Sequence, residues 1–123
     1  MPKVNRSSAA EHIEAEGFEG HYGEAADVTV GFETYTEDAD LTPFFVGLPD
    51  DRCQARHWGY VVQGKVVFHT ADGDETFETG DAYAVGPGHT PTIFAGTEVV
   101  EFSPTDEFAA TMEVVGRNME NAG

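Results

Sequence analysis

Residues 53–91, CQARHWGYVVQGKVVFHTADGDETFETGDAYAVGPGHTP, decide the fold of this chain. Short runs of aromatic and β-branched residues alternate here with turn residues, and none has the spacing of an amphipathic helix. Residues 58–62 predict one strand and residues 65–70 the next, and Ala71-Asp72-Gly73-Asp74 is typical of a hairpin turn. Strands this short and this closely spaced predict an all-β sandwich or barrel.

Strand patterns continue on both sides of this stretch. We expect further strands at residues 27–35, 75–78, 82–85, 92–94 and 98–102. Residues 36–51 form a loop broken by Pro43 and Pro49, but this loop contains Phe44 and Phe45 and is too apolar to be fully solvated. It is expected either to lie against the core or to cover an interface with a second copy of the chain.

The two ends of the chain differ from the middle. Near the start, Ser7 or Ser8 is a candidate cap for a short helix over residues 9–14, which Gly17 would end. At the other end, Ser103 and Pro104 suit a helix start. A single apolar stripe follows, which predicts a helix packed on the outside of the β domain: Phe108, Met112, Val115 and Met119.

Charge is the strongest compositional signal. The chain of 123 residues has 23 acidic and 6 basic side chains, a formal net charge of −17. Such a field repels phosphate backbones and anionic membranes, so we expect neither as a partner. Acids spread along the chain with few lysines are typical of proteins from salt-loving organisms, although an ordinary acidic protein is the alternative. The single cysteine, and the lack of an apolar leader or span, predict a cytoplasmic protein without a disulfide.

The middle of the chain resembles the cupins, small double-stranded β-helix (jelly-roll) proteins. Gly80-Asp81, five residues and then Pro87-Gly88 resemble the second cupin motif. Counting back from Gly64 places His57 where the first motif has its glutamate. Cys53 and Asp51 then stand at the two histidine positions of that motif, and His89 lies two residues before the second-motif histidine position, at Pro91.

The resemblance implies a single domain with three parts: an N-terminal extension at 1–26, a cupin barrel at 27–103 and a C-terminal helix at 104–123. Residues 56–62 and 101–105 are similar to a subgroup of small bacterial and archaeal RmlC-like cupins. A small cupin of this kind is also expected to form a homodimer.

The cupin frame implies a site built from a thiol and two imidazoles. Cys53, His57 and His89 would bind a divalent metal ion, with zinc, iron, nickel and copper all suited to these donors. Residues expected in the pocket or behind the ligands are Asp51, Tyr60, Tyr83 and Glu101. A small-molecule ligand would occupy the barrel, and the fold alone does not choose a reaction.

Simpler interpretations stay open for the same residues. A lone cysteine is often a small buried hydrophobic residue, and a histidine beside Trp58 can be a hydrogen-bonded core residue. His12, His21 and His69 are expected on the surface. Three functions therefore remain: a metal-binding cupin with a small-molecule pocket, a metal-free binding or sensing module, and an assembly protein with a vestigial pocket. No phosphate loop, dinucleotide fingerprint or nucleophile elbow is present in the sequence.

Overall fold

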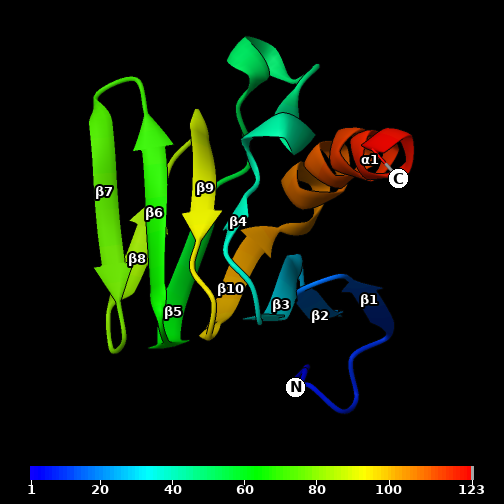
Figure 1. Cartoon of the computed structure of the whole chain (residues 1–123). Coiled ribbons are helices and arrows are strands. Elements are labelled where there is room, and N and C mark those ends of the chain that lie inside the picture. Colours follow the sequence, from blue (N-terminus) through cyan, green and yellow to red (C-terminus); the bar gives the residue numbers. More distant parts are fainter. Residues whose placement is uncertain (123) are drawn as a thin grey trace.

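A computed structural model describes residues 1–122 and shows two antiparallel sheets lying face to face (Figure 1). The larger sheet has the order β1 (Glu11–Ala15), β2 (Phe18–Ala25), β3 (Val28–Tyr35), β10 (Thr97–Pro104), β5 (His57–Gln63) and β8 (Ala82–Val85). The smaller sheet has the order β4 (Ala39–Asp40), β9 (His89–Ile93), β6 (Lys65–Thr70) and β7 (Gly73–Glu78). The prediction of an all-β jelly roll with a C-terminal helix is confirmed.

The core lies between the two sheets and follows from the two-residue period of the strands. On β5, for example, the side chains of His57 and Val61 are buried, while those of Trp58 and Tyr60 between them are exposed. Both sheets contribute to one apolar cluster: Tyr35, Val61, Val66, Phe68, Tyr83, Ile93 and Val99.

The central hairpins lie where the sequence predicts them. The β6–β7 turn passes through Gly73 at a φ of +121°, a region that favours glycine. Among the strand boundaries, the start of β9 differs most from its prediction: β9 begins at His89 rather than at residue 92, because His89 already pairs with Thr70 of β6. This earlier start places His89 within the sheet.

The predicted helix over residues 9–14 was wrong. Residues 11–14 belong to β1, which pairs with β2 in a hairpin that turns at Gly17. A helix of six residues has little stability of its own, whereas pairing with β2 satisfies the backbone of this segment and extends the larger sheet. The boundary expected between the N-terminal extension (1–26) and the barrel (27–103) lies in the turn between β2 and β3.

The C-terminal helix α1 (Thr105–Ala122) begins one residue later than predicted, since Pro104 still pairs with Val28 in the sheet. It lies beside the short 3-10 helix η1 (Thr42–Phe45), as Figure 1 shows, and a second 3-10 helix, η2 (Pro49–Asp51), follows η1. Asn118 on α1 donates hydrogen bonds to the carbonyl oxygens of Phe44 (2.7 Å) and Val46 (2.8 Å). The apolar loop at 36–51 therefore lies against the chain's own helix.

Apolar side chains fill the space between α1 and this loop. They form a second cluster around Phe45, Cys53, Ala55 and Val115, with Met112 and Met119 packed against it. The helix thus closes one opening of the sandwich, a role beyond the predicted packing on the outside. Over residues 1–122, no helix combines the length and apolar character needed to cross a membrane.

Candidate functional site

Cys53, His57 and His89 meet at one buried point. One ligand atom from each lies within 4.8 Å of those of the other two, and the Cys53 Sγ is 3.5 Å from the His57 Nε2. The three residues are only 2%, 7% and 1% exposed, respectively. The structure thus brings together the three residues that the sequence indicated as metal ligands.

The backbone explains this convergence. The N–H of Cys53 donates to the carbonyl oxygen of His89 (2.8 Å), and the N–H of Gly88 donates to the carbonyl oxygen of Cys53 (2.8 Å). Gly88 has a φ of +94°, so the turn before β9 depends on glycine at this position. These bonds hold Cys53 beside His89, and His57 enters from the buried side of β5.

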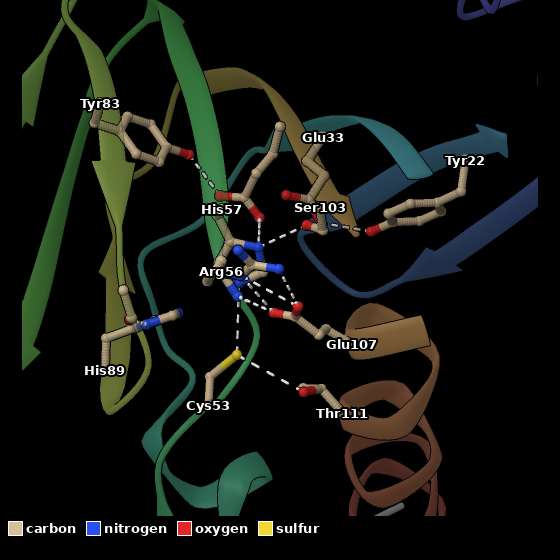
Figure 2. Close-up of polar contacts among 12 residues, drawn as sticks. Tyr22, Glu33, Cys53, Arg56, His57, Tyr83, His89, Ser103, Glu107 and Thr111 are labelled. Atoms are coloured by element: carbon tan, nitrogen blue, oxygen red, sulfur yellow. Dashed lines mark hydrogen bonds and ion pairs between the residues drawn. The ribbon is translucent and has the colours of Figure 1, made fainter. Parts of the chain in front are cut away.

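Hydrogen bonds behind the two imidazoles orient their rings (Figure 2). The Nδ1 of His57 lies 2.6 Å from the Ser103 Oγ and 3.4 Å from the Glu101 Oε1. The Nδ1–H of His89 donates to the carbonyl oxygen of Gly86 (2.7 Å). With Nδ1 engaged on each ring, Nε2 is the nitrogen left for a ligand, the arrangement typical of metal-binding histidines.

The helix α1 completes this side of the site. The Thr111 hydroxyl lies 4.0 Å from the Cys53 Sγ. Glu107, in the first turn of α1, accepts hydrogen bonds from the backbone N–H of Arg56 (3.1 Å) and from its guanidinium (2.5 Å), as Figure 2 shows. The start of the helix is therefore joined to the residue immediately before His57.

Burial sets the protonation of the three donors. Desolvation lowers the pKa of His57 to about 4, and desolvation together with the neighbouring His57 lowers the pKa of His89 to about 4. Desolvation raises the pKa of the Cys53 thiol to about 11. At neutral pH the imidazoles are neutral and ready to bind, whereas the thiol must lose a proton before it can act as a ligand.

A cavity of about 250 Å³ opens next to these donors, between the two sheets and α1. Most of its lining is apolar or aromatic, including Phe68, Phe108 and Met112. Two carboxyl groups, Glu33 and Glu101, also reach it from the larger sheet. The cavity is thus an apolar chamber with Cys53, His57 and His89 and an acidic pair in its wall.

Each carboxyl of the acidic pair accepts a hydrogen bond from a buried tyrosine. The Tyr83 hydroxyl donates to Glu101 (2.5 Å), and the Tyr22 hydroxyl donates to Glu33 (2.5 Å). Desolvation raises the pKa of both carboxyls, and the charge of Glu101 raises that of Glu33 further. Gly59 makes room for this arrangement, since a Cβ there would lie 2.3 Å from the Tyr83 ring. The pair can hold a proton close to the cavity.

The residues expected around the ligands divide into two groups. Tyr83 and Glu101 line the cavity. Tyr60 does not, because it alternates with His57 and Val61 on β5 and is 47% exposed on the outer face. Asp51 is also placed elsewhere: it is exposed on η2, where its carboxylate accepts a hydrogen bond from the N–H of Gly47 (3.0 Å).

Sequence reasoning missed Glu33, Ser103 and Thr111. The signal for Glu33 was its position two residues before Tyr35 on β3, which places both side chains on the same face, opposite to that of Val30. Ser103 lies two residues after Glu101 on β10, so both can face His57. Thr111 gave no such signal, because it stands beside Met112 in an otherwise apolar stripe.

Comparison with known proteins identifies the fold. A scan against protein-family models and a search of curated protein sequences gave no match. Solved structures do match. A protein of unknown function from Rhizobium leguminosarum superposes with a TM-score of 0.60 at 18% identity, over 84% of this chain and 95% of that one. An RmlC-like cupin from Shewanella frigidimarina gives 0.53 at 16% identity, over 76% and 83%.

An enzyme provides a third match. Oxalate decarboxylase from Lactobacillus farciminis gives a TM-score of 0.60 at 15% identity, over 86% of this chain and 33% of the larger enzyme. Identities this low establish a shared architecture and leave the chemistry to be argued from the site.

Proposed function

We propose that this chain, which has the RmlC-like cupin fold, binds a divalent transition-metal ion through Cys53, His57 and His89 and a small molecule in the adjoining cavity. The observation that supports this most is the convergence of three buried donors. Both imidazoles have their Nδ1 atoms engaged, so their Nε2 atoms remain as potential ligands.

Donor chemistry and spacing fit such an ion. With Zn–S near 2.3 Å and Zn–N near 2.05 Å, a sulfur and a nitrogen on one tetrahedral ion lie about 3.6 Å apart. The Cys53 Sγ and His57 Nε2 are 3.5 Å apart. The longest separation in the cluster is within 4.8 Å, so a modest side-chain adjustment would bring all three atoms to one ion.

Each residue around the cluster would then have a definite role. When bound, the ion would supply a Lewis acid with an open coordination position, because the protein provides three donors. Ser103 and the Gly86 carbonyl orient the imidazoles, and the apolar lining excludes water. Glu101 and Glu33 hold a proton at the cavity wall for a polar group of the small molecule.

A metal-free binding module is the second candidate, and one observation favours it. Within residues 1–122, every buried side-chain nitrogen and oxygen has a hydrogen-bond partner without any ion. In this case Cys53 is a packed core residue, and the imidazoles contact an organic ligand directly.

Metal analysis of untagged protein separates the two candidates. For the metal centre, we expect about one equivalent of bound zinc, iron, nickel or copper, slow labelling of Cys53 by thiol reagents, and faster labelling once a chelator removes the ion. Cys53→Ser and His89→Ala should lose the ion bound between Cys53, His57 and His89, while His69→Ala, a surface control, should keep it. A Cys53 labelling rate that does not respond to chelator, together with a metal content that Cys53→Ser and His89→Ala leave unchanged, would favour the metal-free module.

A further inference from the structure

The second group of metal-ligand side chains is on the outer face of the N-terminal hairpin. His12 on β1 and His21 on β2 are direct partners in the strand register, and their rings stack at 4.3 Å with an angle of 7° between the planes. Glu19 lies two residues before His21 and therefore shares its face. One ligand atom from each of the three lies within 4.8 Å of the others.

From this group we infer a second metal site, for a divalent transition ion such as Zn²⁺, formed by His12, Glu19 and His21. The Glu19 Oε1 lies 2.7 Å from the His21 Nε2 and 4.0 Å from the His12 Nε2. Nitrogen and oxygen ligands on one tetrahedral zinc ion lie about 3.4 Å apart, between these two distances. Small rotations of surface side chains would therefore close the site.

The surroundings of the three donors supply a further carboxylate, access from solvent and a negative field. Glu14 pairs directly with Glu19 in the register, so its exposed carboxylate lies on the same face of the hairpin. It would serve as a fourth donor. His12 and Glu19 have side chains 47% and 45% exposed, which leaves an approach for an ion and its water. The net charge of −17 also attracts cations, and the guanidinium of Arg6, whose charge acts on Glu19, is paired with Glu98 (2.5 Å).

Binding at this position would reach the cavity through the strand. β1 is the edge of the larger sheet, and of its five residues only Ile13 is partly buried. Ile13 and Ala15 line the cavity from the opposite face of β1. An ion that joins His12 to His21 would hold β1 on β2 and so stabilise one wall of the cavity.

The test uses the full, untagged chain carrying Cys53→Ser, which weakens the interior cluster and keeps the two sites distinguishable. Titration with Zn²⁺ alone should show about one equivalent bound, and amide hydrogen exchange across β1 should slow when Zn²⁺ is present. In this background His12→Ala should weaken Zn²⁺ binding at least tenfold and remove the protection of β1. Glu19→Gln keeps both imidazoles and the size of the side chain, and it should also weaken Zn²⁺ binding. Because this change does not shorten a side chain of the hairpin, weaker binding would be due to the lost ligand and not to fraying of the hairpin.

His69→Ala is the matched control. His69 also lies on a hairpin beside a carboxylate, the Asp74 Oδ1 at 2.9 Å, but no second imidazole is opposite it. The control should leave Zn²⁺ binding unchanged. The inference is overturned if the Cys53→Ser chain binds no Zn²⁺, or if His12→Ala and Glu19→Gln bind it as tightly as their parent does.

Discussion

When zinc binds to the interior cluster near pH 6, its three ligands should together release about one proton per ion. The Cys53 thiol has a pKa of about 11, so it is fully protonated at this pH and must lose its proton to bind. His57 and His89 have pKa values of about 4 and are already neutral. Two imidazoles of ordinary pKa, near 6.5, would each be about three-quarters protonated at pH 6 and would raise the total to about 2.5 protons.

The assay is isothermal titration calorimetry on a chain carrying His12→Ala, which weakens the hairpin site and leaves the interior cluster intact. Two buffers with different ionisation enthalpies are used, since the difference between the measured heats gives the number of protons released. Cys53→Ser should reduce proton release by about one proton per ion and weaken binding. Glu101→Gln is the necessary control. Burial raises the pKa of the Glu101 carboxyl, so a dication bound close to it would also expel a proton from that group.

Two results would refute the reasoning. In the first, zinc binding releases about 2.5 protons whether residue 101 is Glu or Gln. The imidazoles of His57 and His89 would then be partly protonated at pH 6, and burial would not lower their pKa values to about 4. Zinc binding that releases no proton, or that is unchanged by Cys53→Ser, would remove Cys53 from the ligand set.

Three further predictions concern orientation, salt and assembly. Ser103→Ala removes the partner of the His57 Nδ1 and should weaken zinc binding about 10- to 100-fold, whereas Ser103→Thr keeps the hydroxyl and should not; equal affinities would contradict the orienting role. The melting temperature should rise between about 0.1 M and 2 M KCl, because salt screens the self-repulsion of a net charge of −17; a flat or falling curve would contradict a halophilic surface. The homodimer should form through the outer face of the larger sheet, where Trp58, Tyr60 and Phe102 are 46%, 47% and 41% exposed, since the loop first expected to form the interface packs on α1. Sedimentation in high salt should therefore show a wild-type dimer that Phe102→Lys dissociates, and a wild-type monomer would contradict this.

The sequence by itself determined the features that depend on neighbouring residues. The strands at 58–70, the hairpin turn before Gly73 and the apolar stripe of α1 all follow from the spacing of side chains a few positions apart. The spacing of Cys53 and His57, set against the cupin frame, likewise pointed to the position where these two residues and His89 meet.

Only the tertiary structure decided which distant segments meet. Residues 11–15 form a strand because β2 is available to pair with them. Ser103 and Glu33 lie close to His57 and the cavity because β10 lies between β3 and β5. The same contacts decided protonation: a thiol, two imidazoles and two carboxyls have shifted pKa values because long-range packing removes water from them. Periodicity along the chain reports which face of a strand a residue occupies, but pairing and desolvation arise between segments far apart in sequence, and no local pattern specifies them.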